Sequence, residues 1–560
     1  MIRAEKRRRE KANRKAAKAD RSTRPSTQGA EIPTLTVQQA LAMGVEHHQA
    51  GRIIEAENIY WKILDIEPGN PFALHFLGVI AIHYGDFESA IPLIEKAISI
   101  KAEFPEAHNN LGLALQGLGK ADDAQNSYRA AIAGKPNFAE AYNNLGISSQ
   151  STDELDEAQS SYLKAISINP NYAEAHYNLG STLQAMGKRD EALESYRAAL
   201  SIHPDYAEVH NNIGVTLEEQ GKRDEALTSY EKALSIKPNF AEAHNNHGVT
   251  LRRMGQLDQA QSSYRKAISA DPDYTEARYN LGVTLQDLGE FDEAIEWLDR
   301  ADPEARKNQA SAALLECYYR KKDMAGFERQ LERISNNQPF NFRAACASAF
   351  VAQQMGTANS YAFCDNPVDL VSVYDVLKNG DMSPELLSEI TSTIKSGIAY
   401  EKYEQGHVTT GSISTGNLFA DDISFAQPLE QVIRRCVGRF VETHNDDKSR
   451  IFRDWPTTYS LDGWYVRLFG GGEISAHVHE GWLSGVFYVQ APVDKKENSG
   501  NIEFTLNGYD LPVIHENFPR QTIETQTGRL VLFPSSLPHR VFPFLDTQER
   551  ISLAFDIIPA

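Results

Sequence analysis

The chain is poor in cysteine and in long apolar stretches. Its 560 residues include four cysteines, which are scattered and form no C-x-x-C pair: Cys317, Cys346, Cys364 and Cys436. This pattern excludes a disulfide framework or a cysteine-based zinc site, and it favours reduced thiols in a cytoplasmic protein. No apolar run reaches the roughly 18 residues that a membrane-spanning helix needs, so we expect no membrane span.

Positive charge is also scarce, because 56 Lys and Arg stand against 76 Asp and Glu and give a net charge of −20. This balance excludes general affinity of the folded part for nucleic acid. Residues 1–24 are the exception, with eleven basic and three acidic residues. We expect residues 1–34 to be a basic tail, disordered or helical, that either contacts RNA or an acidic partner or is a solvated tail. It lacks the apolar core of a signal peptide.

A repeat fills the first half of the chain. A glycine recurs every 34 residues, and an alanine follows each one twelve residues later: Gly44, Gly78, Gly112, Gly146, Gly180, Gly214, Gly248 and Gly282. This period, with small residues where two helices pack closely, is the signature of tetratricopeptide repeats. Residues 35–307 are therefore predicted to form eight repeats that stack into a superhelix with a concave groove.

An asparagine stands two residues before the glycine in six repeats: Asn110, Asn144, Asn178, Asn212, Asn246 and Asn280. This ladder resembles the repeats of O-linked N-acetylglucosamine transferase, which implies a protein or peptide held in the groove by its backbone. An amide offers two donors and an acceptor, which suits an extended chain of any sequence. The alternative is that Asn-Leu-Gly is only repeat consensus. Histidines recurring two residues before the ladder are predicted to pack or to line the groove, and not to bind metal.

Residues 308–360 lose the 34-residue period but keep helical spacing, which predicts a helical cap that bridges to a second domain at 361–560. In that domain we expect helices at 384–390 and 429–435. The stretch 409–418 is rich in Gly, Ser and Thr and is expected to form a lid or a substrate loop.

Three histidines in the second domain suggest a metal site. His477 and His479 lie two residues apart between strand-like runs, and His539 follows sixty residues later. Residues two apart in a strand point to the same face, so both imidazoles of the pair project into one barrel mouth. Imidazole suits Fe(II), and open coordination positions suit oxygen chemistry. The alternative is a pair that is solvated or part of the core.

An anion-binding arm follows the third histidine. Arg550 begins a run in which apolar residues alternate with Arg550, Ser552 and Asp556. The alternation predicts a strand with Arg550 and Ser552 on one face, where a guanidinium fork and a hydroxyl hold a carboxylate.

The segments around these residues resemble the 2-oxoglutarate-dependent Fe(II) oxygenases. The order is G-W-Y-V-R-L-F-G-G-G at 463–472, A-H-V-H-E at 476–480 and L-S-G-V-F-Y-V at 483–489. The pattern H-x-H-x-x-x-x-S-G-x-x-Y is similar to that of members that follow tetratricopeptide repeats. The resemblance covers 361–560 and implies a double-stranded β-helix (jelly-roll) barrel with flanking helices, behind an all-α superhelix.

The same resemblance implies roles for single residues. His477 and His539 are implied as iron ligands, and Arg550, Ser552 and Tyr488 as the residues around the distal carboxylate of 2-oxoglutarate. The implied cofactors are Fe(II), 2-oxoglutarate as cosubstrate and ascorbate.

One position departs from the family, which has H-x-D or H-x-E where this chain has His479. A three-histidine site has one negative charge fewer, so iron is expected to bind more weakly or to differ in redox behaviour. The adjacent Glu480 is an alternative third ligand, although strand alternation points it away. Two functions therefore remain open: an oxygenase that hydroxylates a protein or peptide recruited by the repeats, and a non-catalytic interaction scaffold with a degenerate barrel. Oligomeric state is also open.

Overall fold

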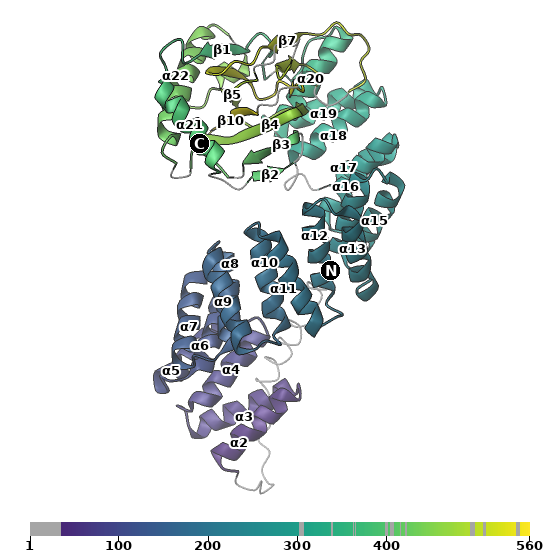
Figure 1. The fold of residues 1–560 in the computed structure, drawn as a ribbon. Coiled ribbons are helices and arrows are strands. Elements are labelled where there is room, and N and C mark those ends of the chain that lie inside the picture. The colour runs from purple at the N-terminus through teal and green to yellow at the C-terminus, as the bar shows by residue number, and fades with distance from the viewer. Residues whose placement is uncertain are drawn as a thin grey trace. The chain divides into compact units, whose positions relative to one another are not determined.

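The structure is a computed structural model (Figure 1). It describes residues 35–301, 307–337, 340–361, 363–364, 366–397, 401–403, 408–414, 416–420, 423–447, 449–492, 499–507, 511–544 and 549–559. The predicted basic tail lies outside the described residues. The chain divides into two compact units, one through Pro272 and one from Asp273.

The first unit is entirely helical in its described part. Its helices are α2 (Val37–Gln49), α3 (Ile53–Ile66), α4 (Pro71–His83), α5 (Phe87–Ile100), α6 (Pro105–Gly117), α7 (Ala121–Gly134), α8 (Ala139–Ser151), α9 (Leu155–Ile168), α10 (Ala173–Ala185), α11 (Arg189–Ile202), α12 (Ala207–Glu219), α13 (Arg223–Ile236), α14 (Ala241–Arg253) and α15 (Leu257–Ala270). Two helices fall in each 34-residue period, which confirms the predicted repeats. The eighth pair belongs to the second unit.

The recurring glycine lets the two helices of a repeat approach each other. A Cβ at Gly214 would lie 2.5 Å from Cε1 of Tyr230, a ring that is buried in the core of its repeat. The same pairing of a glycine with a tyrosine sixteen residues later recurs at Gly44, Gly112, Gly146, Gly180 and Gly248. Alanine would overlap the ring at each of these positions, so the period reflects a steric requirement.

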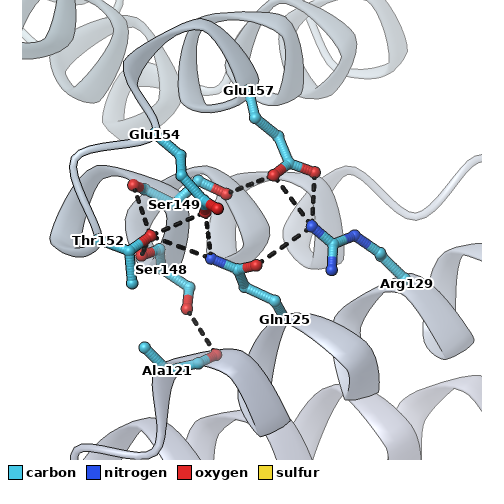
Figure 2. Close-up of polar contacts among 8 residues, drawn as sticks. All are labelled: Ala121, Gln125, Arg129, Ser148, Ser149, Thr152, Glu154 and Glu157. Carbon is cyan, nitrogen blue, oxygen red and sulfur yellow. Dashed lines mark hydrogen bonds and ion pairs between the residues drawn. The ribbon is translucent and has the colours of Figure 1, made fainter.

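The fourth repeat replaces part of its apolar core with polar contacts. Ser149 occupies the phase that holds leucine at Leu115 and Leu183, and it is fully buried. Figure 2 shows the network around it, in which the Ser149 hydroxyl donates to Glu157 at 3.3 Å and Arg129 bridges to Glu157 at 2.8 Å. Hydrogen bonds therefore replace leucine packing at this junction.

The second unit joins helices to a sheet. Its helices are α16 (Thr275–Leu288), α17 (Phe291–Arg300), α18 (Lys307–Arg320), α19 (Met324–Asn337), α20 (Phe342–Met355), α21 (Pro384–Ser396), α22 (Ala426–Thr443) and α23 (Arg450–Arg453). Its strands are β1 (Ser372–Asp375), β2 (Glu401–Tyr403), β3 (Val408–Ser414), β4 (Tyr459–His477), β5 (Leu483–Gln490), β6 (Ile502–Thr505), β7 (Arg520–Ile523), β8 (Arg529–Pro534), β9 (His539–Val541) and β10 (Arg550–Pro559).

The strands form an antiparallel sheet with the order β1-β8-β5-β10-β4-β9-β6-β7, and β3 pairs with β2 and β4 away from this path. The strands curl, as a jelly-roll barrel requires, and the predicted fold class is confirmed (Figure 1). β10 lies between β4 and β5 and is hydrogen-bonded on both sides. Residues on β10 are therefore fixed relative to both neighbours.

Helices α18 to α20 lie in the span expected to form a cap, and they pack on the barrel. The Tyr319 hydroxyl donates to the carbonyl of Pro512 at 2.9 Å, and the Gln354 amide donates to the carbonyl of His515 at 2.9 Å. Helices α21 and α22 confirm the two helices expected after residue 361. The expected lid at 409–418 is wrong over residues 409–414, because they belong to β3 and pair with β4, which supplies their backbone hydrogen bonds. No helix within the described ranges is long and apolar enough to cross a bilayer.

Candidate metal centre

Three histidines converge at one end of the barrel. His477 is the last residue of β4, His539 is the first residue of β9, and the two are directly paired across the strands. His479 lies just beyond β4. One ligand atom from each ring lies within 4.8 Å of the others. Sheet register therefore produces the cluster that the sequence predicts, and the exposed Glu480 is outside it.

Carbonyl and carboxylate oxygens fix the orientation of the three rings. Nδ1 of His477 lies 2.9 Å from the carbonyl oxygen of Ser475, and Nδ1 of His539 lies 3.4 Å from that of Leu537. A carbonyl oxygen only accepts, so Nδ1 carries the proton in these contacts and Nε2 keeps the lone pair. This tautomer is the one that a metal ligand coordinating through Nε2 requires.

His479 has a stronger anchor, which is a buried carboxylate. Its Nδ1 lies 2.9 Å from Oδ1 of Asp556, and both side chains are about nine-tenths buried, with exposures of 8% and 11%. The hydroxyl of Ser484 donates to the same carboxylate at 2.6 Å, and the backbone N–H of His479 donates to the carbonyl of Ser535 at 3.0 Å. Histidines that bind metal usually donate their other ring N–H to a carboxylate in this way.

Nε2 of His479 is the ring nitrogen that is left to bind a metal. It is buried and has no hydrogen-bond partner among the described residues. A buried polar atom without a partner costs free energy, so it needs a functional explanation, and metal binding is one. The donor set of three imidazoles fits Fe(II), although it also suits other divalent transition metals.

A second cluster of unpartnered polar atoms surrounds Arg550. Arg550 is 1% exposed, and its guanidinium carbon lies 5.1 Å from the centroid of the Tyr488 ring. Nε and Nη1 of Arg550 and the hydroxyl of Tyr488 have no hydrogen-bond partner in the described part of the chain. Burial raises the pKa of Tyr488, so its hydroxyl remains a donor. Ser552, 2% exposed, stands opposite Tyr488 in the register of β10 and β5.

These atoms make a slot for an anion. A buried guanidinium without a carboxylate neighbour is costly, because the charge has lost its water and gained no counter-charge. Two N–H groups and a phenol O–H, all unpaired, match the oxygens of a carboxylate. The residues present therefore fit the distal carboxylate of 2-oxoglutarate.

Asp556 and Ser484 were not among the predicted site residues. Two signals were present: the alternation along 550–556 put Asp556 on the same face as Arg550 and Ser552, and Ser484 is the serine of the pattern H-x-H-x-x-x-x-S-G-x-x-Y. Antiparallel register pairs Asp556 with Ser484 on β5, and this pairing brings the two side chains together.

The asparagine ladder ties neighbouring repeats to each other. Each Nδ2 of five ladder residues lies within hydrogen-bond distance of the side chain one position before the ladder in the preceding repeat: Asn110 to His75, Asn144 to Asn109, Asn178 to Asn143, Asn212 to Tyr177 and Asn246 to Asn211, at 2.8–3.3 Å. The sixth, Asn280, is 9% exposed. Histidines two residues earlier bind the carbonyls of Pro170, Pro204 and Pro238 at 2.9–3.1 Å, as expected for packing residues.

Comparison with known families agrees with this geometry. Residues 462–556 match the family model described as "Putative 2OG-Fe(II) oxygenase", an interval that contains the histidine cluster and the Arg550 slot. The chain carries an oxygenase-family domain beside its repeats. Tetratricopeptide models match at 73–104, 105–138, 151–187, 171–239, 229–262 and 251–316. No curated protein matches the chain.

Solved structures match the repeats. MamA is 26% identical over 29% of this chain and 95% of its own, with a TM-score of 0.28. YrrB, described as a TPR protein with an unusual peptide-binding site, is 25% identical over 33% of this chain and 95% of its own, with a TM-score of 0.29. PilF of Pseudomonas aeruginosa is 21% identical over 37% of this chain and 94% of its own, with a TM-score of 0.33.

Proposed function

We propose that the protein is an Fe(II)- and 2-oxoglutarate-dependent dioxygenase that hydroxylates a protein or peptide recruited by its repeats. The observation that carries this proposal is that one barrel holds both a three-histidine cluster and the buried Arg550, whose Nε and Nη1 have no hydrogen-bond partner among the described residues. A histidine cluster alone is compatible with many functions. A carboxylate slot in the same barrel favours the cosubstrate of this family.

Each residue has a defined task. His477, His479 and His539 hold Fe(II), with Asp556 fixing the ring of His479. Arg550 and Tyr488 bind the distal carboxylate of 2-oxoglutarate, and Ser552 lies beside them. Iron, 2-oxoglutarate and oxygen supply the oxidising chemistry, while the protein positions them and limits access of water.

The repeats recruit the substrate in this proposal. Five of the six ladder amides place Nδ2 against the neighbouring repeat, as Asn178 does when it donates to Asn143. The second N–H and the acceptor oxygen are the groups that would hold a peptide backbone. The four cysteines are buried thiols, which supports a cytoplasmic site of action.

Anaerobic titration with Fe(II), with and without 2-oxoglutarate, tests the enzyme. A weak visible charge-transfer band should form, and it should vanish in Arg550→Ala and in His539→Ala. Loss of the paired contact should weaken cosubstrate binding by about 1.5–3 kcal/mol, which is roughly ten- to 150-fold. Arg540→Ala, an exposed arginine paired with Glu503, is the matched control and should keep the band.

The competing function is a scaffold without chemistry, and His479 in place of a carboxylate favours it. No iron binding by the folded protein would support the scaffold. Iron binding without the band would point to a three-histidine dioxygenase that uses no 2-oxoglutarate. Succinate formation with a peptide library, lost in Arg550→Ala, would establish the hydroxylase.

A further inference from the structure

Lysines and aromatic rings form a recurring slot where one repeat of the first unit meets the next. The lysine ends one repeat, lies over the ring of a phenylalanine three residues later, and pairs with a glutamate 29 residues earlier. Lys135 shows this with Phe138 at 4.4 Å and Glu106 at 3.1 Å, and Lys237 with Phe240 at 4.4 Å and Glu208 at 2.7 Å. An ammonium between a carboxylate and a ring face is attracted by both.

Three junctions keep the glutamate and the aromatic ring of this slot but have no lysine: Asn169 with Glu140 and Tyr172, His203 with Glu174 and Tyr206, and Asp271 with Glu242 and Tyr274. In the second of these junctions, His203 stands where Lys135 and Lys237 stand in theirs. A cavity of about 520 Å³ opens there, and Tyr172 and Asp205 also line it. No lysine or arginine is among the residues that line the cavity in the described structure.

The cavity has a negative environment and neutral aromatic walls. Burial is the main cause that raises the pKa of Tyr206 to about 12, and the neighbouring Tyr177, Glu174 and Glu208 contribute to this rise. Burial also raises the pKa of Tyr172 to about 12, with Glu174 and Glu140 contributing. Both phenols therefore stay protonated at neutral pH. The cavity therefore offers two neutral aromatic rings and the carboxylate of Glu174 to a bound cation, and no lysine or arginine lines it among the described residues.

We propose that this cavity binds the side-chain ammonium of a lysine carried by an extended peptide. The peptide's lysine would take the place that Lys135 and Lys237 hold in their own junctions, against Glu174 and Tyr206. The inference rests on the proposed function for the statement that the peptide is a substrate, and it adds a chemical class to that substrate. Binding of the peptide needs neither iron nor 2-oxoglutarate.

A positional-scanning library of synthetic peptides is the probe, with the full-length protein and fluorescence polarisation as the readout. Lysine should be enriched at one position, and acetylation of that lysine should abolish the preference because it removes the charge. Glu174→Gln should weaken binding of the selected peptide by about tenfold or more, as expected for a lost charge-assisted contact. Glu106→Gln, which alters a slot already filled by Lys135, is the matched control and should leave affinity unchanged.

His203→Lys gives an independent check. The next junction already carries a lysine at this position, Lys237, so the variant should fold, keep or raise its unfolding midpoint, and lose affinity for the lysine peptide. Absence of any lysine preference, absence of peptide binding, or equal affinity of Glu174→Gln and the parent would each overturn the inference. Peptide-independent turnover of 2-oxoglutarate, measured on the same samples, separates the two proposals. Turnover without lysine preference overturns only the cavity, and lysine preference without turnover overturns only the enzyme.

Discussion

Asp556 should control how tightly the histidine cluster binds iron. In Asp556→Asn the side chain keeps its shape but has one acceptor oxygen where the carboxylate has two. Ser484 donates to Oδ1 at 2.6 Å, and Nδ1 of His479 lies 2.9 Å from Oδ1 and 3.2 Å from Oδ2. An amide NH2 in place of Oδ2 would face the Nδ1–H donor and leave a single oxygen to accept from both groups. The negative charge beside the ring of His479 is also lost.

The size of the effect follows from this arrangement. Loss of a carboxylate behind a metal-ligating histidine typically costs about 10- to 100-fold in affinity, or roughly 1.4–2.7 kcal/mol. We expect the upper part of this range, because His479 and Asp556 are only 8% and 11% exposed and water cannot readily replace the lost contact. A three-histidine site has no ligating carboxylate, so Asp556 is the negative group in direct contact with it among the described residues.

Anaerobic competition between the protein and a chelator for Fe(II), repeated with Co(II), measures this affinity without any turnover. Asp462→Asn is the matched control, because Asp462 stands directly across from Asp556 on β4. Within the described part of the chain, its side chain makes no hydrogen bond to any of the three histidine rings. It should leave metal affinity nearly unchanged. An Asp556→Asn variant that keeps its unfolding midpoint and binds iron as tightly as the parent would refute the reasoning.

Three further predictions concern stability and cosubstrate binding. Burial lowers the pKa of His75 to about 4, below the 6.5 of an unfolded histidine. As the pH drops, the unfolded chain therefore takes up the proton first. The unfolding free energy of the first unit should fall by up to about 3 kcal/mol between about pH 6.5 and about pH 4. His75→Asn, which restores the residue found at this phase in Asn109 and Asn143, should abolish that slope in urea titrations followed by circular dichroism. Gly214→Ala should lower the unfolding free energy by about 1–3 kcal/mol, because the new methyl group overlaps Tyr230. Gly438→Ala is the control: this glycine lies in α22 with no neighbouring atom within 4 Å, so the unfolding free energy should rise by up to about 1 kcal/mol. Equal effects of the two substitutions in chemical denaturation would argue against the packing explanation. Tyr488→Phe should weaken 2-oxoglutarate binding by about 1 kcal/mol while Fe(II) affinity is retained, and calorimetric titrations that show no change would remove the hydroxyl from the slot.

Much of this organisation was predictable because it depends on spacing. The 34-residue period follows from the close contact between a glycine and a large side chain sixteen residues later, which is tyrosine in six of the eight repeats, and that contact is local. His477 and His539 were predictable as a pair because barrel strands bring distant segments into register. The alternation along β10 placed Arg550 and Ser552 on one face without further information.

The rest depended on contacts that no local pattern encodes. Ser484 and Asp556 are 72 residues apart, and only the register of β5 against β10 shows that one holds the other. Residues 409–414 have the composition of a loop, but an available edge of β4 makes them a strand. The cavity at His203 is lined by two segments about 30 residues apart, 171–174 and 203–206, so no local pattern predicts it.

β10 has one consequence for how this domain can change during evolution. Arg550 and Asp556 lie on the same face of the strand, six residues or about 20 Å apart at roughly 3.3 Å per residue. A single-residue insertion or deletion between them would turn one of the two side chains to the opposite face, and a slip of the whole strand would turn both. Because β4 and β5 both bond to β10, such a slip would also break two ladders at once. Descendants should therefore diverge at β10 by substitution, keeping its length, for as long as both the metal and the anion matter to them.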